Sequence, residues 1–165
     1  YQFVNGELSR AYVLDDRKKE DLTQKELYNK ECATCHIGFQ PQFLPKRSWN
    51  KLMDNLSNHF DTDASLSKDS LNKIKTYLEE NSSDSKSLHG EAAEFAQSIK
   101  KDSTPIRISE IPKFQREHKE VTTKMIEQKE VKSISNCIAC HKDANEGTYR
   151  ERNIHIPNFG KSKDD

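Results

Sequence analysis

Four cysteines form two Cys-x-x-Cys pairs, and a histidine follows each pair directly. The first run is Cys32-x-x-Cys35-His36, and the second is Cys137-x-x-Cys140-His141. Two intervening residues let both sulfurs reach one edge of a porphyrin, and the next residue then lies beneath the iron. This pattern is the attachment signature of c-type haem. It predicts two covalently attached haem c groups, with His36 and His141 as iron ligands.

Other uses of paired cysteines fit the sequence less well. In zinc ribbons the two pairs usually lie about 15–20 residues apart, whereas Cys35 and Cys137 lie in opposite halves of this chain. A thioredoxin-like site needs a preceding strand, and residues 29–31 have no strand character. A structural disulfide framework would not require histidine after each pair. The haem interpretation is therefore favoured over zinc and over a redox disulfide.

The composition agrees with a cofactor in the core. Only 32% of the 165 residues are hydrophobic, and the mean hydropathy is −1.01. A chain this polar has difficulty burying enough apolar area to offset the entropy of folding, so we expect the haems to supply apolar surface that side chains do not. The 27 basic and 27 acidic residues balance, which makes the chain a poor candidate for non-specific nucleic-acid binding, since this needs a basic surface.

The sequence also bears on location. No stretch approaches the roughly 18 consecutive apolar residues of a membrane span, so we expect a chain that does not cross a membrane. It begins at Tyr1 rather than methionine. We therefore expect the mature form of an exported protein whose signal peptide has been removed.

The first half of the chain reads as helices around a loop. We predict a helix over residues 21–31, a loop with two prolines over 37–46, and a helix over 49–60 with Ser48 as its N-cap. Its inward face would carry a set of six residues. These are Trp49, Leu52, Met53, Leu56, His59 and Phe60. Ser67 is predicted to cap a further helix, whose inner face would carry four more side chains. They are Leu71, Ile74, Tyr77 and Leu78.

The polar run over residues 81–85 breaks this pattern and divides the chain into two predicted haem domains, 1–82 and 83–165. In the second half we predict a helix over 86–101 and a short helix near Pro112 with Phe114 and His118 on one face. The tail from residue 145 onward reads as irregular. No strand alternation is convincing, so the predicted class is mainly α, with a less regular C-terminal domain.

The second ligand of each iron decides the type of chemistry. A haem with one protein ligand can bind gases or peroxide, whereas a haem with two mainly carries electrons. For the first haem the candidates are His59 and Met53, and for the second they are His118 and Met125. Near a covalent haem we favour the two histidines. Two further histidines are weaker candidates for iron ligands. His89 lies at the margin of a helical face, and His155 lies in the tail.

Specific runs of the sequence resemble known cytochromes c. Leu27-Tyr28 before the first haem motif, the 49–60 helix and Ile74-Lys75-Thr76-Tyr77-Leu78 resemble a compact class I cytochrome c. Most of the chain, from about residue 20 to 158, resembles the diheme cytochrome c family often called DHC. The matching runs include Gly38-Phe39-Gln40-Pro41-Gln42-Phe43-Leu44-Pro45, Asn58-His59-Phe60, Arg116-x-His118-x-Glu120-Val121 and Glu151-Arg152-Asn153-Ile154.

The resemblance implies more than the motifs do. It implies two histidine ligands at both haems, His36 with His59 and His141 with His118. It also implies electron donation to a monohaem, high-spin, oxygen-binding cytochrome c, and electron receipt from a membrane cytochrome b. Because haem attachment of this kind takes place outside the bacterial cytoplasm, the class implies a periplasmic location.

The resulting prediction is an electron-transfer protein rather than an enzyme, which relays single electrons between two haems. The alternatives are a diheme peroxidase-like enzyme and a haem-based ligand sensor, both of which need one iron with an open position. Haem propionates need hydrogen-bond donors, and Arg47, Trp49 and Arg152 are predicted to provide them because each lies near a haem motif or the 49–60 helix.

Overall fold

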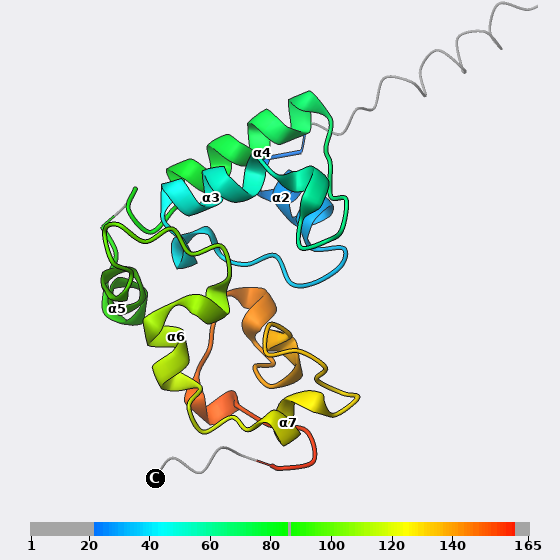
Figure 1. Cartoon of the computed structure of the whole chain (residues 1–165), viewed down its shortest axis with the longest axis vertical. Helices are drawn as coiled ribbons and strands as arrows, with labels where there is room; N and C mark the ends of the chain where they lie inside the picture. The colour runs from blue at the N-terminus through cyan, green and yellow to red at the C-terminus, as the bar shows by residue number, and fades with distance from the viewer. Residues whose placement is uncertain (1–21, 86, 161–165) are drawn as a thin grey trace, which may run out of the picture.

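The structure is a computed structural model that describes residues 22–85 and 87–160 (Figure 1). Within these residues it is mainly α, as predicted, with no strand and only three isolated β-bridges. The α-helices are α2 (Gln24–Cys32), α3 (Lys46–Met53), α4 (Lys68–Glu80), α5 (Gly90–Ser98), α6 (Pro112–Glu117) and α7 (Thr123–Glu127). The 3-10 helices are Pro41–Phe43, Leu56–Asn58, Ile108–Glu110, Cys137–Ala139, Ala144–Glu146 and Glu151–Asn153.

Helix α2 places the first haem motif. Thr23 caps it with a complete capping box, in which its side chain accepts from the Glu26 N–H and the Glu26 carboxylate accepts from the Thr23 N–H. The helix ends at Cys32, so the rest of the motif forms the turn that follows. Tyr28 is buried on the inner side. The prediction of a helix here is confirmed, and Asp21, its expected first residue, lies outside the described residues.

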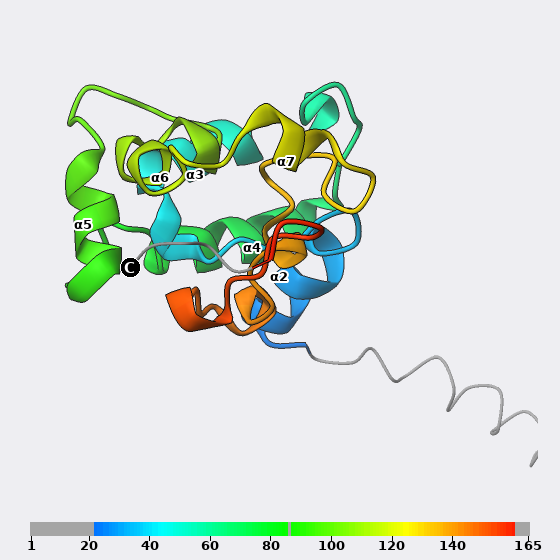
Figure 2. The same cartoon turned by 90° about the horizontal axis from the view of Figure 1, so that it is seen from below.

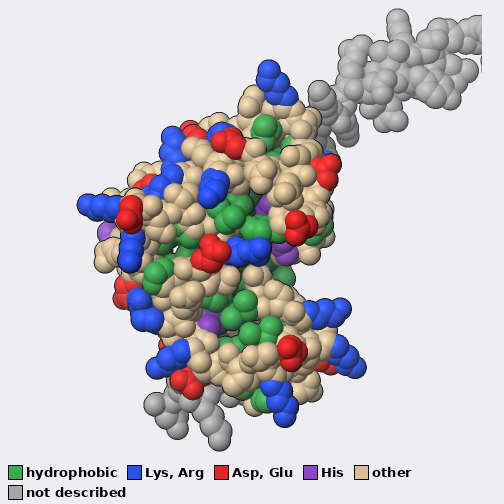
Figure 3. Space-filling model, in the orientation of Figure 1, with side chains coloured by type: hydrophobic (Ala, Val, Ile, Leu, Met, Phe, Trp, Pro, Cys, Tyr) green, Lys and Arg blue, Asp and Glu red, His purple; other side chains and the backbone are tan. Residues whose placement is uncertain are grey.

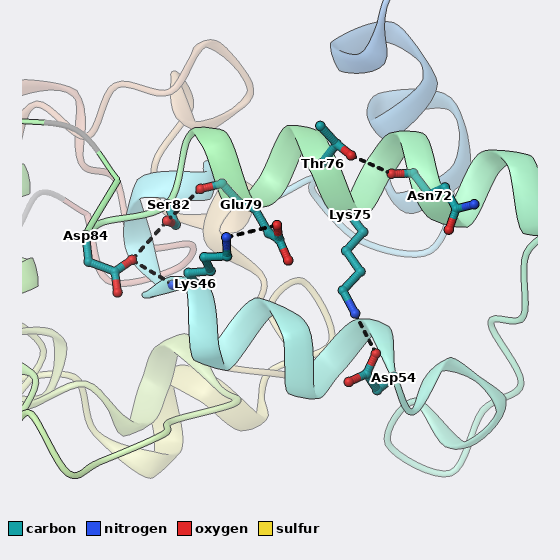
Figure 4. Close-up of polar contacts among 8 residues, drawn as sticks. All are labelled: Lys46, Asp54, Asn72, Lys75, Thr76, Glu79, Ser82 and Asp84. Atoms are coloured by element: carbon teal, nitrogen blue, oxygen red, sulfur yellow. Dashed lines mark hydrogen bonds and ion pairs between the residues drawn. The ribbon is translucent and has the colours of Figure 1, made fainter.

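Helix α4 packs against both α2 and α3 and forms the upper part of the molecule in Figure 1. Ser67 caps it as predicted, by accepting a hydrogen bond from the Ser70 N–H. Ile74 and Leu78 on its inner face are fully buried. Ion pairs fix its outer side to α3. They are Lys75 with Asp54 at 2.7 Å and Lys46 with Glu79 at 3.1 Å (Figure 4).

The lower part of Figure 1 holds α5, α6 and α7 together with the C-terminal 3-10 turns. Figure 2 shows α5 at one end of the molecule with α6 near it, and these two helices pack together. Helix α5 is shorter than the predicted 86–101. It begins at Gly90 and ends at Ser98, and residue 86 lies outside the described residues. The tail from 145 to 160 is irregular, as predicted, and 161–165 lie outside the described residues.

One hydrophobic core joins the two halves of the chain. Its buried members in the first half include Leu44, Ile74 and Leu78, and those in the second half include Ile111 and Phe114. The predicted boundary at 82/83 is itself buried and bonded. The Ser83 N–H donates to the Leu44 carbonyl at 3.0 Å. The Ser82 hydroxyl donates to Asp84 at 2.9 Å (Figure 4). The division into two domains stays a prediction, but the two halves share this core.

The predicted helix over 49–60 is wrong at both ends. It begins earlier because Pro45, which lies just outside the first turn with its φ fixed, serves as N-cap in place of Ser48. It ends at Met53 because polar residues with low helix propensity follow at 54 and 55. A 3-10 turn and then a tight turn at His59–Thr62 take the place of the last helical turns.

None of the described helices has the length and apolar character that crossing a bilayer requires.

We expect Ile74→Ala to lower the free energy of unfolding by about 2–5 kcal/mol, because it opens a cavity in the shared core. The matched control is Thr76→Ala on the outer face of the same helix, where the side chain is exposed and the change should stay within about 0.5 kcal/mol. Denaturant unfolding followed by circular dichroism measures both. Equal losses for the two variants would contradict the assignment of the core.

Candidate haem sites

The first haem motif lies where α2 ends. Cys32 is half-buried, Cys35 is exposed, and neither forms a disulfide. His36 follows in a bend, and its Nδ1 donates to the Ile37 carbonyl at 2.7 Å. A ligating histidine usually donates one ring nitrogen to a carbonyl in this way, which fixes the ring and leaves the other nitrogen for the metal.

His59 faces this histidine from the tight turn. The ring centres of His36 and His59 lie 6.2 Å apart, and their planes differ by 25°. The two central residues of the turn, Phe60 (φ 52°) and Asp61 (φ 67°), adopt left-handed backbone conformations, which are costly for a bulky side chain such as phenylalanine. The guanidinium of Arg107 lies over the Phe60 ring, 4.0 Å from its centre. His59 is therefore held by a strained turn rather than by a helix, which corrects the sequence prediction.

The second motif forms the 3-10 turn Cys137–Ala139, and the His141 N–H donates back to the Cys137 carbonyl at 2.7 Å. His118, the C-cap of α6, lies opposite. The ring centres of His118 and His141 are 6.0 Å apart, with planes 62° apart. His118 stacks on Phe114 at 3.9 Å, and its Nδ1 donates to the Phe114 carbonyl at 2.8 Å. The predicted pairing of Phe114 and His118 on one face is confirmed.

The spacing of each pair fits one iron between two imidazoles. A coordinating nitrogen lies about 2.0 Å from a first-row metal and about 1.1 Å from its own ring centre, so two opposite imidazoles have ring centres about 6.2 Å apart. A haem supplies four nitrogens of its own and needs only these two ligands from the protein. No three His, Cys, Asp or Glu side chains within residues 22–85 and 87–160 come together as a bare metal ion such as zinc would need.

The pKa values of the thiols and imidazoles also agree with haem attachment and histidine ligation. Burial raises the pKa of both Cys32 and Cys137 to about 11, so both thiols keep their protons at pH 7, whereas a redox-active cysteine needs a lowered pKa. Burial also lowers the pKa of His59 and of His141, in each case assisted by the facing histidine. Both rings are therefore neutral at pH 7, which is the form that binds a metal.

The alternative ligands do not take part in these facing pairs. Met53 is buried within the hydrophobic core, and Met125 lies on α7. His89 and His155 are exposed. The geometry thus brings together His36 with His59 and His118 with His141, and their role as ligands stays a prediction.

The predicted propionate donors have other partners. The Trp49 indole N–H, its single donor, donates to the Pro41 carbonyl at 2.7 Å, which is at odds with a bond to a propionate. Arg47 donates to the Ser103 carbonyl at 2.7 Å and to the Lys100 carbonyl at 3.0 Å, so it ties the two halves of the chain together. Arg152 is exposed on the last 3-10 helix, and its role stays a prediction.

Sequence reasoning missed several aromatic and polar neighbours of the histidines. Phe39 lies 5.2 Å from His36, and Tyr149 lies 5.4 Å from His141, measured between ring centres. Phe39 is close to its histidine in sequence and could have been found, whereas nothing local marks Tyr149 or Arg107. In the space-filling view, hydrophobic and histidine side chains gather along the hollow between the upper and lower parts of the molecule (Figure 3).

Two Cys-x-x-Cys-His turns on a mainly helical fold, each with a second histidine opposite the first, define a c-type cytochrome with two haems. The family model of dihaem cytochrome c matches residues 28–149. The chain belongs to this dihaem cytochrome c family and carries its two covalently bound haem c groups. Membership is consistent with electron transfer, and the cytochrome c family is typically secreted or periplasmic.

Solved structures support the assignment. The diheme cytochrome c from Rhodobacter sphaeroides is 43% identical, with a TM-score of 0.66 over 74% of this chain and 94% of that one. The diheme cytochrome type c from Shewanella baltica OS155 is 30% identical, with a TM-score of 0.67 over 85% of this chain and 98% of that one. A comparison with curated protein sequences gives no match.

We expect Trp49→Phe to destabilise the fold by about 1–3 kcal/mol, because it removes a buried hydrogen bond and part of a buried ring. Thermal unfolding measures the loss. The reduction potentials of both haems should remain unchanged, since the indole bonds to Pro41. A shifted potential would instead favour the propionate contact that the sequence predicts.

Proposed function

We propose that this protein relays single electrons between two haems, each of which has two histidine ligands. His36 and His59 hold the first iron, and His141 and His118 hold the second. The observation that carries the proposal is the spacing of the two pairs, 6.2 Å and 6.0 Å between ring centres. Cys32 with Cys35, and Cys137 with Cys140, provide the thioether attachments.

Each haem supplies a one-electron ferric–ferrous couple when bound. The chain keeps the ligands fixed, since carbonyl hydrogen bonds orient His36 and His118 and the stacked Phe114 covers one face of His118. Two imidazole ligands favour a lower potential than a methionine–histidine pair. An iron held from both sides has no open position for a substrate, which supports a relay over the peroxidase-like enzyme and the ligand sensor.

The proposed partners rest on the family resemblance. They are a monohaem, high-spin, oxygen-binding cytochrome c as electron acceptor and a membrane cytochrome b as donor, and the proposed location is the periplasm. Stopped-flow mixing of the reduced protein with such a monohaem cytochrome tests the first partnership. Second-order oxidation that slows with rising salt would support a specific encounter, and absence of electron exchange would contradict it.

We expect His59→Ala to convert one low-spin haem to a high-spin form that binds carbon monoxide when reduced, while the other stays low-spin. His118→Ala should do the same for the other haem. The controls are His89→Ala and His155→Ala, which change exposed histidines outside the two pairs. Visible spectra with and without carbon monoxide measure all four variants. Ready binding by the unmodified protein would contradict the relay and favour an enzyme or a sensor.

We expect Cys32→Ser combined with Cys35→Ser to remove the first haem alone, because each pair of thiols attaches one group. Denaturing mass spectrometry should find two haems on the unmodified chain and one on the variant. The matched double substitution at Cys137 and Cys140 should remove the second haem. A chain that keeps both haems after either change would contradict the attachment assignment.

A further inference from the structure

The imidazole of His141 differs from the other motif histidine in how it is held. His36 donates its Nδ1 to a carbonyl, and so does the distal His118. The Nδ1 of His141 is buried and has no hydrogen-bond partner among the described residues. The usual means of fixing a ligating imidazole is therefore missing at His141, although the ring still lies 6.0 Å from the His118 ring, measured between centres.

The Tyr149 ring packs against the His141 ring. The ring centres lie 5.4 Å apart with planes at 70°, an edge-to-face arrangement that aromatic rings favour. The Tyr149 hydroxyl donates to Gln40 Oε1 at 2.7 Å.

Gln40 belongs to the segment that follows the first haem motif, and it is clamped against the second. Its amide nitrogen donates to the Ala144 carbonyl at 3.3 Å. Gly147 lies against its side chain so closely that a Cβ at this position would be 3.3 Å from Gln40 Cγ, and its φ of +76° also suits glycine. In Figure 1 the loop after α2 passes beside the segment that carries residues 137–147.

A second aromatic contact supports Tyr149 from the same loop. The Phe43 ring meets the Tyr149 ring edge-on, with centres 5.6 Å apart. Tyr149 is thus held at its hydroxyl by Gln40 and on its ring by Phe43, and both residues lie between the first haem motif and α3. Tyr149, which meets the His141 ring, is therefore itself held by side chains of the other half of the molecule.

We propose that Tyr149, anchored by Gln40, is the positioning residue for His141, and that it sets the angle of this imidazole in place of the missing hydrogen bond. The proposal rests on the proposed function, in which His141 ligates the second iron. Through this contact the loop that follows the first haem motif controls the geometry of the second haem. The two centres are then coupled by packing.

Electron paramagnetic resonance of the fully oxidised protein tests this proposal. The angle between two axial imidazole planes governs the anisotropy of a low-spin ferric signal. Planes at 25° and 62° therefore predict two distinguishable signals, the more anisotropic one from His118 and His141. The variants are Tyr149→Leu, Tyr149→Phe and Gln40→Ala. The control is Tyr77→Phe, since Tyr77 packs against Tyr28 and not against a histidine of either pair.

We expect Tyr149→Leu to shift or broaden the more anisotropic signal alone, because the ring that meets His141 is lost. Tyr149→Phe and Gln40→Ala both remove the hydrogen bond between these two side chains. Gln40→Ala also removes the bond from the Gln40 amide to the Ala144 carbonyl. We expect each variant to cause a smaller shift, and the double variant to match Gln40→Ala alone. Tyr77→Phe should leave both signals unchanged. Denaturing mass spectrometry of each holoprotein confirms that both haems are attached, and if Tyr149→Leu fails to fold, Gln40→Ala decides.

Three results would overturn the proposal. They are an unchanged second signal in both Tyr149→Leu and Gln40→Ala, equal shifts of both signals, and additive effects of Tyr149→Phe and Gln40→Ala. The proposed function fails in a different way. The unmodified protein would then lack two low-spin signals of bis-imidazole type, whatever the variants do. If the unmodified protein shows two such signals and the Tyr149 variants do not change them, only the positioning role is contradicted and the proposed electron relay is not.

Discussion

Two imidazoles that come from separate segments must stay about 6 Å apart in each centre, and most of the fold serves this requirement. The cysteine motifs themselves lie at the end of α2 and in a 3-10 turn. What holds the facing histidines is the core beneath them, in which α4 packs on α2 and α3, and Phe114 brings the His118 helix onto the same cluster. A chain with 32% hydrophobic residues concentrates its buried side chains where they fix these distances.

Local chemistry made several elements predictable. The Cys-x-x-Cys-His runs indicate the cofactors and two ligands, and Ser67 with the pattern of Ile74 and Leu78 predicts α4. The predicted helix through His59 fails because hydrophobic periodicity says nothing about where the backbone leaves the helical region. Leu56 keeps the helical spacing although the helix ends at Met53. His59 still faces His36, since a turn can present a side chain in the same direction as a longer helix.

The hydrogen-bond partner of a side chain cannot be predicted from the local sequence. Arg47 and Trp49 lie near a haem motif, as a propionate donor would, yet both donate to backbone carbonyls. Tyr149 and Gln40 are 109 positions apart, and only the folded chain brings them together. A donor is equally suited to a carbonyl, a carboxylate or an amide oxygen, so proximity in sequence cannot select among them. The residues that fix a ligand from a distance therefore emerge only from the structure.

The two distal histidines are held by elements of different stability, His59 by the turn at His59–Thr62 and His118 by the end of α6. Phe60 and Asp61 hold left-handed conformations on the surface, pinned by a guanidinium from another segment. Local unfolding of the turn that carries His59 breaks two backbone hydrogen bonds and relieves the strain of the left-handed residues. Displacing His118 instead requires the end of α6 to unwind and the stacking of His118 on Phe114 to be lost. In hydrogen exchange, the turn that carries His59 is therefore expected to unfold locally at a low free energy. The end of α6 that carries His118 is expected to unfold only at the higher free energy of the core.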